Sequence, residues 1–345
     1  MRQAPIAKLD ASTPLPEVVR YGFRSLDRAW LILDNRLASR SRPALWVVNG
    51  EHEVYLTIML TDVLGQGPSA LASAAVPDRH HFCGRGGKDF IPLWRDAEAT
   101  SPNLPAALLG QIAVRLGKVV SAPDLFAYTY GILSATAFAE RFAEELTLPP
   151  LHLPITTDAL LFEAVAAQGR HLLWLHTYGT RFVPEGQRKG RLPAGKARWS
   201  QPVHATELPE SFEWVPAAGG GASGALRVGS GRLEPVSFEA WSFSVSSYEV
   251  LKSWLEFRMK NRSGSKSSEL DDIRPTAWDA ALSQELQELV WVLEATVEAQ
   301  PVPAELLSDV LQGSLFHANE LTAPTAAERA APGDDEEGPA QAMLI

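Results

Sequence analysis

The sequence has few of the features that mark membrane or secreted proteins. It contains one cysteine, Cys83, which has no second cysteine in the chain for a disulfide. No apolar run approaches the roughly 18 residues of a membrane span, and residues 1–16 lack the apolar stretch of a secretory signal. We therefore expect a cytoplasmic protein that makes no contact with a membrane.

Motifs of catalysis are missing as well. The only Pro-Pro pair, Pro149-Pro150, is followed by leucine, whereas the turn that holds a flipped base in DNA amino-methyltransferases needs an aromatic residue there. Gly87-Lys88 and Gly117-Lys118 are followed by aspartate and valine, not by the Ser or Thr that completes a phosphate-binding loop. We predict that the chain is not an enzyme and carries no cofactor.

One cluster has the composition of a metal site. His80, His81 and Cys83 offer three possible ligands within four residues, but no second cluster follows at zinc-finger spacing. Asp271-Asp272 lacks the further carboxylates of a nuclease and is better explained as a helix cap or as a partner for Arg274. We therefore predict no bound metal, and a metal-dependent enzyme built on the His-Cys cluster remains a third hypothesis.

Charge is unevenly distributed along the chain. The net charge is −10, which by itself argues against a polyanionic partner. The stretch 181–198 nevertheless has a net charge of +5, the stretches 20–42 and 252–266 of +4 each, and the tail 324–345 of −4. Local fields govern the capture of a polyanion more than total charge does. Each basic stretch is thus either a DNA-binding segment or a solvated loop.

The first half of the sequence predicts a β-rich lobe followed by helices. Residues 45–48, 54–60 and 70–76 have the pattern of short antiparallel strands, with Asn49-Gly50 as a hairpin turn. Pro123-Asp124 begins a helix that ends near Leu146. Thr156-Thr157-Asp158 begins a second helix, which Gly169 ends. Residues 171–177 then have the pattern of a buried strand.

The second half is predicted to be loop-rich and then helical. Residues 183–235 hold many Gly and Pro residues, with two short strands at 225–228 and 232–236. A strand is expected at 241–245 and a helix at 248–257. Leucines at positions 282, 286, 289 and 293 fall on one helix face, and prolines at 301 and 303 separate that helix from a shorter one.

These segments define the fold class as α+β, with a mixed or antiparallel β lobe, packed helices and a C-terminal helical segment. The predicted organisation is a flexible arm (1–16), a main region (17–323) and a disordered acidic tail (324–345). Within the main region, the β-rich lobe extends to about residue 120, mixed α/β structure occupies 121–275, and helices occupy 276–313.

Several blocks of sequence, in order from about Tyr21 to Leu321, resemble one known family. They are YGFRSLD (21–27), WLILD (30–34), Arg42-Pro43, PDRHHF (77–82), Gly86-Gly87, IPLWRD (91–96), WLHTYG (174–179), Arg181-Phe182, Trp241, SELDDIRP (268–275) and Trp278. This pattern is similar to the C-terminal specificity region of type ISP restriction–modification enzymes. In that family the region recognises the DNA target, while nuclease, helicase-like motor and methyltransferase parts lie elsewhere in the polypeptide; here those parts are missing.

The resemblance implies a DNA sequence-recognition module of a restriction–modification or related phage-defence system. Its expected partners are double-stranded DNA and a methyltransferase or helicase–nuclease subunit. The alternative hypothesis is a protein-interaction scaffold in a defence or DNA-modification complex that does not itself bind DNA.

The predicted DNA-binding residues lie in two basic loops and at the end of the segment 171–177, because Lys and Arg contact phosphates and polar side chains read base edges. They are Tyr178, Arg181, Arg188, Lys189, Arg191, Lys196, Arg198, Arg258, Lys260, Asn261, Arg262 and Lys266. Gln187, Gln201 and Asn261 are candidate base readers. His176 and Tyr178 have a second interpretation, as core residues with satisfied polar groups.

Overall fold

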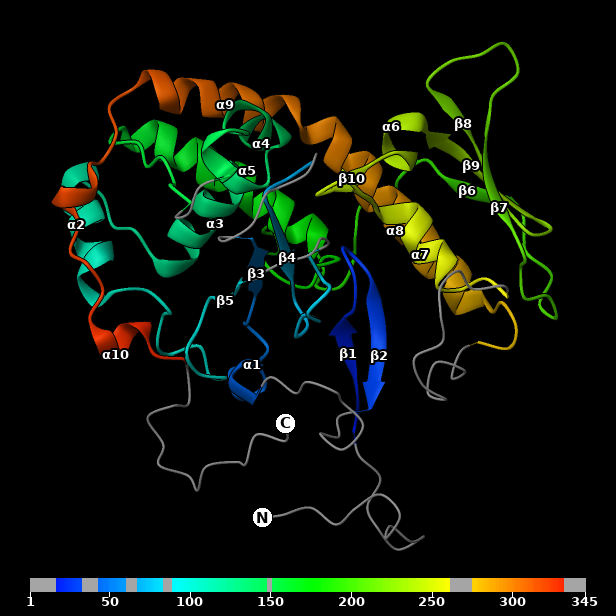
Figure 1. The fold of residues 1–345 in the computed structure, drawn as a ribbon, viewed down its shortest axis with the longest axis horizontal. Coiled ribbons are helices and arrows are strands. Elements are labelled where there is room, and N and C mark those ends of the chain that lie inside the picture. The colour runs from blue at the N-terminus through cyan, green and yellow to red at the C-terminus, as the bar shows by residue number, and fades with distance from the viewer. Residues whose placement is uncertain are drawn as a thin grey trace, which may run out of the picture.

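The computed structural model describes residues 17–32, 43–59, 67–82, 89–147, 151–260 and 275–331. It confirms the α+β class, and all strand pairs in the named sheets are antiparallel. Two large hydrophobic cores and one small cluster organise the described residues. One core lies among helices in the left half of Figure 1, and the other lies under a four-stranded sheet at the right.

The N-terminal strands form a hairpin and a three-stranded sheet. The hairpin pairs β1 (Val18–Gly22) with β2 (Arg28–Ile32). In the sheet, β3 (Tyr55–Ile58) lies between β4 (Ala70–Ser73) and β5 (Asp89–Pro92). All residues of β3 and β4 are buried, because Leu56 faces the first core while Leu71 faces the second. The sheet therefore joins the two halves of the molecule.

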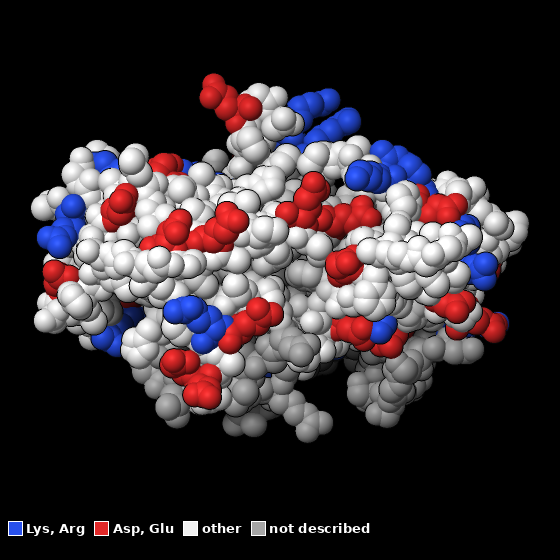
Figure 2. All heavy atoms as spheres, turned by 90° about the horizontal axis from the view of Figure 1, so that it is seen from above, with Lys and Arg blue, Asp and Glu red and all other residues white. Residues whose placement is uncertain are grey.

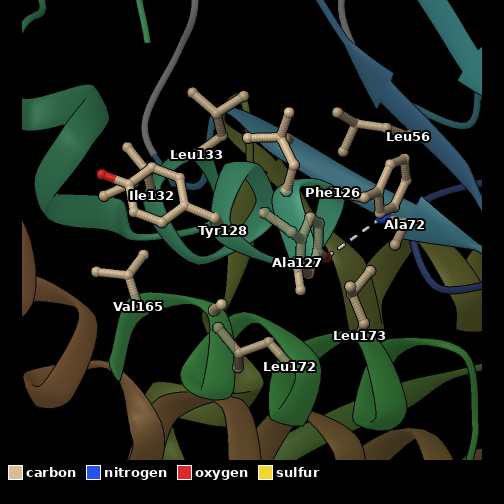
Figure 3. Packing of buried hydrophobic residues seen from close by; sticks show 14 of the residues in the cluster. Leu56, Ala72, Phe126, Ala127, Tyr128, Ile132, Leu133, Val165, Leu172 and Leu173 are labelled. Atoms are coloured by element: carbon tan, nitrogen blue, oxygen red, sulfur yellow. Dashed lines mark hydrogen bonds between the residues drawn. The ribbon is translucent and has the colours of Figure 1, made fainter. Parts of the chain in front are cut away.

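Helices surround the first core. They are α2 (Ala106–Leu116), α3 (Ala122–Leu133), α4 (Thr136–Arg141), the 3-10 turn Glu145–Thr147, α5 (Ala159–His176) and α9 (Pro301–Gln312). The short helix α1 (Pro43–Val47) instead packs through Leu45 in a small separate cluster with Tyr55 of β3. Side chains of α3 fill the layer between the strands and α5 (Figure 3). The α3 helix begins with a capping box between Ser121 and Asp124, as the Pro123-Asp124 pair predicts.

The α3 and α5 helices touch through their backbones. A Cβ atom at Gly169 of α5 would lie 1.8 Å from the carbonyl oxygen of Ala127, and one at Gly131 of α3 would lie 2.5 Å from that of Val165. Only glycine leaves room for this approach. Gly169 therefore belongs to the middle of a helix that continues to His176, and the prediction that it ends the helix is wrong.

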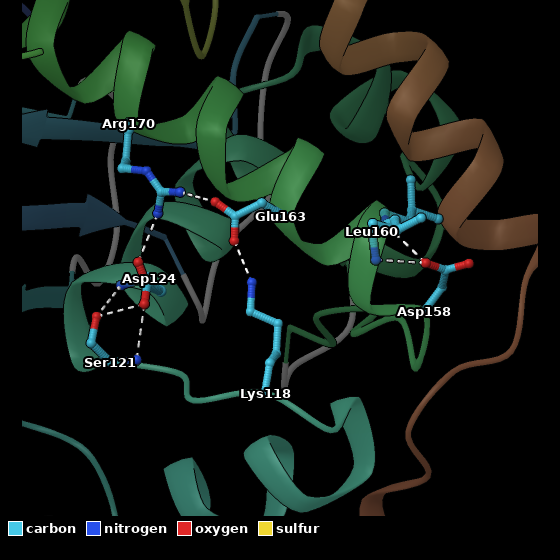
Figure 4. Close-up of polar contacts among 8 residues, drawn as sticks. Lys118, Ser121, Asp124, Asp158, Leu160, Glu163 and Arg170 are labelled. Atoms are coloured by element: carbon cyan, nitrogen blue, oxygen red, sulfur yellow. Dashed lines mark hydrogen bonds and ion pairs between the residues drawn. The ribbon is translucent and has the colours of Figure 1, made fainter.

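Ion pairs fix the outer side of the same contact. Arg170 of α5 binds both Asp124 of α3 and Glu163, and Glu163 also binds Lys118 in the segment before α3 (Figure 4). These bonds set the angle and register at which the two helices meet. At the start of α5, the Asp158 carboxylate accepts hydrogen bonds from the backbone N–H groups of Leu160 and Leu161, so the predicted start is confirmed.

The second core lies between a sheet and the C-terminal helices. The sheet has the order β6 (Arg198–Gln201), β9 (Gly231–Ser237), β8 (Ser223–Val228), β7 (Phe212–Pro216). The strands predicted at 225–228 and 232–236 are thus confirmed. The remaining elements of this half are α6 (Phe238–Trp241), β10 (Ser244–Val245), β11 (Tyr248–Glu249), α7 (Val250–Glu256) and α8 (Ala280–Ala299).

The α8 and α9 helices link the two cores, since α8 packs in the second and α9 in the first. Leu286, Leu289 and Leu293 are fully buried, as the spacing of the leucines predicts. Pro301 begins α9 immediately after α8, at the predicted break. No described helix is long and apolar enough to cross a membrane.

Several local predictions are wrong. Residues 45–48 lie in and just after α1, and Asn49-Gly50 follows that helix and joins no pair of strands. The segment 171–177, predicted to be a strand, is the C-terminal end of α5. The prediction failed because residues 172–177 are all buried, so the sequence lacks the polar periodicity that marks a surface helix. Trp241 ends α6, so the strand predicted at 241–245 is limited to Ser244–Val245. The lobe predicted up to residue 120 contains the strands β1 to β5 and also α2.

The start of the acidic tail is ordered. Residues 326–329 form the short helix α10 (Ala326–Arg329), with a capping box between Thr325 and Glu328. The Glu328 carboxylate also accepts a hydrogen bond of 2.7 Å from the backbone N–H of Ala106, the first residue of α2. The prediction of disorder is therefore wrong for residues 324–331, and residues 332–345 lie outside the described part of the chain.

We predict that Gly169→Ala lowers the free energy of unfolding by about 3 kcal/mol, because the added Cβ forces two helices apart. The control is Gly110→Ala on α2, where nothing lies within 4 Å of the added Cβ; there we expect a gain of about 0.5–1 kcal/mol. Urea unfolding measures both. Equal effects of the two substitutions would contradict the glycine contact.

Candidate nucleic-acid interface

A buried chain of hydrogen bonds fixes the end of α5. Thr296 Oγ1 donates to the Val292 carbonyl, so it accepts from His176 Nε2–H at 2.9 Å. His176 Nδ1 in turn accepts from the Tyr130 hydroxyl, which accepts from Ala72 N–H. Burial lowers the pKa of His176 to about 3, so the ring stays neutral. This arrangement agrees with the interpretation of His176 as a core residue.

Tyr178 lies just after the end of α5 and changes the direction of the chain. It has a left-handed backbone (φ 54°), which is strained for a residue other than glycine. Its hydroxyl donates to the Leu26 carbonyl at 2.6 Å, and the Arg28 guanidinium stacks 3.6 Å from its ring centre. The side chain is only 6% exposed. Tyr178 therefore holds the hairpin to α5, which agrees with its interpretation as a core residue with a satisfied polar group, and its contact with DNA stays a prediction.

Residues 181–198, named here the basic loop, begin at an arginine that faces inward. The Nε–H of Arg181 donates a hydrogen bond of 2.8 Å to the Glu53 carbonyl, and its Nη2–H donates one of 3.1 Å to the Gly50 carbonyl. With these bonds the guanidinium supports the start of the loop. Its role in the structure is to hold the backbone, in contrast to the predicted contact with DNA.

The middle of the basic loop presents its cations to solvent. Two consecutive turns, in which Gln187 N–H donates to the Pro184 carbonyl and Arg191 N–H to the Arg188 carbonyl, shape this part. Arg188, Lys189 and Arg191 are all exposed. Lys189 pairs with Glu51, whereas Arg188 and Arg191 form no ion pair with a described residue. The structure thus brings these three predicted residues together on one surface.

The basic loop ends beside α8. Lys196 is exposed, and its charge acts on Glu294. Arg198 donates to the carbonyls of Gly195 and Ala197 and lies 4.7 Å from the ring centre of Trp291. It therefore helps to close the loop, as Arg181 does at the other end.

The second predicted basic loop is mostly outside the described residues. Asn261, Arg262 and Lys266 fall there, so they stay predictions. Arg258 binds both carboxylate oxygens of buried Asp27, at 2.7 and 3.1 Å, and stacks on Trp254. With its side chain 11% exposed, Arg258 is held in the core by this ion pair, and its contact with DNA stays a prediction. Lys260 is exposed and pairs with Glu210.

A groove of about 570 Å³ lies at the base of the basic loop, lined by Trp94, Arg181, Phe182 and Lys189 among others. Behind its wall lies the buried carboxyl of Glu53. One oxygen of this carboxyl accepts backbone N–H bonds from Val54, Leu93 and Trp94, and the other has no described partner. Burial raises the pKa of Glu53 to about 7.

The His-Cys cluster does not assemble a metal site among the described residues. His81 is buried and its Nδ1 shares a hydrogen bond of 3.0 Å with Thr57 Oγ1, whereas His80 is exposed. Burial lowers the pKa of His81 to about 4. Cys83, Asp271-Asp272 and Arg274 lie outside the described part of the chain.

The surface charge agrees with a local, rather than global, basic site. Seen from the side of α9, acidic side chains are spread across the middle of the molecule, and basic side chains gather along the upper edge, right of centre (Figure 2). On the face seen there, a polyanion would thus meet an attractive field mainly along that edge.

Comparison with known families settles the class of the protein. A model of the Type ISP C-terminal specificity domain matches residues 2–290. The chain belongs to this family. No curated protein matches the chain.

Solved structures share the fold of this specificity domain. A nuclease-deletion mutant of the Type ISP restriction–modification enzyme LlaGI with a DNA substrate mimic matches with a TM-score of 0.53 and 17% identity, over 85% of this chain and 21% of that one. The DrdV–DNA complex matches with a TM-score of 0.62 and 16% identity, over 84% of this chain and 28% of that one. The ATP-dependent Type ISP enzyme LlaBIII bound to DNA matches with a TM-score of 0.56 and 14% identity, over 90% of this chain and 19% of that one. This chain thus spans less than a third of each.

Some residues of the specificity domain's candidate site were missed in the sequence. Gly179 and Trp291 contact the basic loop, Gly195 lies within it against Trp291, and Glu53 supports the wall of the groove beside it. The WLHTYG block (174–179), which resembles the family, contains Gly179, and this was the one feature of the sequence that could have indicated its role. Trp291 had no such sign, because it lies 94 residues from the carbonyl that it binds.

The raised pKa of Glu53 predicts a pH-dependent stability. Since the folded pKa is about 7 and the ordinary value is 4.5, the folded specificity domain binds the extra proton between these values. This contribution to stability is fully present below about pH 4.5 and is lost as the pH rises through 7, with an amplitude of about 3 kcal/mol.

Urea unfolding of the wild type and of Glu53→Gln at pH 4.5, 6 and 8 tests this. The wild type should lose about 3 kcal/mol relative to the variant from the lowest to the highest pH. The control, Glu51→Gln, changes an exposed carboxylate and should leave that loss in place. Parallel curves for the wild type and Glu53→Gln would refute the assignment.

Proposed function

We propose that this specificity domain recognises a double-stranded DNA target and directs a partner methyltransferase or helicase–nuclease subunit of a restriction–modification system to it. The observation that carries the proposal is the basic loop, which presents Arg188, Lys189 and Arg191 together on the surface of a chain in this family. The DNA in the complexes of LlaGI, DrdV and LlaBIII, which share the fold, supports it.

The proposed chemistry is recognition without catalysis. Exposed guanidinium and ammonium groups replace the counterions of phosphates, which gives affinity that falls as salt rises. Arg188 and Arg191 have the bidentate donors that fit guanine in the major groove, and Gln187 between the same turns has an amide that fits adenine. These side chains lie within a few residues of one another, so one loop supplies both kinds of contact.

We predict that Arg188→Glu/Arg191→Glu lowers affinity for duplex DNA at least tenfold at low salt and reduces the slope of log affinity against log salt by about 2, because two phosphate contacts are lost. Fluorescence anisotropy with a labelled duplex measures both quantities. Lys189 is left unchanged, since it also holds Glu51.

The matched control reverses two exposed arginines elsewhere, Arg115→Glu/Arg141→Glu, with the same change in net charge. It should bind DNA nearly as the wild type does. If the wild type retains no duplex at low salt, or if both double variants lose affinity equally, the proposal fails. In that event the alternative of a scaffold that does not bind DNA, consistent with the net charge of −10, is the better reading.

A further inference from the structure

The C-terminal end of the basic loop closes on a single indole ring. The backbone of Gly195 lies against Trp291 of α8, and a Cβ at Gly195 would lie 2.4 Å from Cδ1 and 2.7 Å from Cγ of that ring. Trp291 Nε1 donates a hydrogen bond of 2.9 Å to the Ala197 carbonyl. The Arg198 guanidinium covers the same ring. Gly195, Ala197 and Arg198 are thus all held by the side chain of Trp291.

The N-terminal end of the loop is closed by its own backbone. Gly190 N–H donates to the Gly179 carbonyl at 2.7 Å. A Cβ at Gly179 would lie 2.6 Å from the Arg191 carbonyl oxygen, and Gly179 also has a left-handed backbone (φ 74°). Substitution there would therefore displace Arg191 directly. Arg188 and Lys189 lie inside this closed turn of backbone, and Arg191 follows directly after it.

These contacts give order to a segment that forms no helix or strand until β6 begins. Ordering a free loop on binding costs conformational entropy, and contacts made before binding reduce that cost. Base edges are read by hydrogen bonds of fixed geometry, whereas phosphate attraction tolerates displacement of the cation. Loosening the loop should therefore affect sequence discrimination more than non-specific affinity.

We propose that Trp291 and Gly195 are positioning residues for sequence-specific DNA recognition, which hold the basic loop in the form that reads the target. The inference rests on the proposed function. Neither residue needs to touch DNA, because both act through the backbone of residues 195–197. Trp291 is partly buried against the second core, so α8 serves as the rigid support of the loop.

The first step of the test is to obtain the target. The full chain selects bound duplexes from a random-sequence pool, and the affinities of the selected duplex and of a scrambled duplex are then measured. We expect Gly195→Ala and Trp291→Ala each to reduce the ratio of these two affinities about tenfold. The salt dependence of binding to the scrambled duplex should stay unchanged.

Two further variants separate positioning from simple loss of stability. Trp291→Phe keeps most of the packing and loses the hydrogen bond to Ala197, so it should reduce the ratio while the protein remains folded. Trp214→Phe loses a comparable indole bond, to the Val236 carbonyl in the sheet, and should leave the ratio unchanged.

A double variant tests the contact itself. Because the ring of Trp291 is what a Cβ at Gly195 would strike, Gly195→Ala/Trp291→Ala should discriminate no worse than Trp291→Ala alone. Unchanged ratios in Gly195→Ala and Trp291→Phe, with a wild type that does discriminate, would overturn this inference alone. A wild type that selects no sequence would overturn the proposed function and, with it, the inference.

Discussion

The backbone contact between α3 and α5 is the constraint on which the rest of the structure depends. Gly131 and Gly169 let the helices approach until each glycine lies against a carbonyl of the other helix. The ion pairs of Arg170 and Glu163 then fix the register of the contact. With α5 placed in this way, its last residue, His176, reaches both Tyr130 of α3 and Thr296 of α8. One helix thereby positions both cores.

The candidate interface follows from this placement within a few residues. Tyr178 and Gly179 turn the chain out of α5 with left-handed backbones, and Arg181 ties the new direction to the carbonyls beside β3. The basic loop then crosses to Trp291 on α8. Because α5 and α8 are already joined through His176, the two supports of the loop cannot move independently. Its order is a property of the helical core, although the loop itself has little regular structure.

The sequence predicted what depends on local chemistry and missed what depends on distant contacts. The cap at Asp158 and the leucine face of α8 are local signals, and both predictions are confirmed. The segment 171–177 was misassigned because residues 172–177 at the end of α5 are all buried, which removes the helical periodicity from that part of the sequence. Asn49-Gly50 has the composition of a hairpin turn, but Gly50 packs against the backbone of Ala97, which no local pattern reveals.

Charge in the sequence could not distinguish cations that support the fold from cations that face solvent. Arg181, Arg198 and Arg258 lie in basic stretches, yet each binds the protein itself: the first two bind backbone carbonyls, and Arg258 binds Asp27. Burying the guanidinium of Arg181 or Arg258 without such partners would cost several kcal/mol. Arg198 is exposed, but its carbonyl bonds and Trp291 hold it against the protein. Among the described residues, the basic side chains left for a polyanion are fewer and closer together than the sequence suggested. A compact group of cations can attract DNA even when the net charge of the protein is negative. The reason is that salt screens charges beyond about 10 Å, so the nearest charges govern the attraction. An overall charge of −10 is therefore compatible with DNA recognition by one loop.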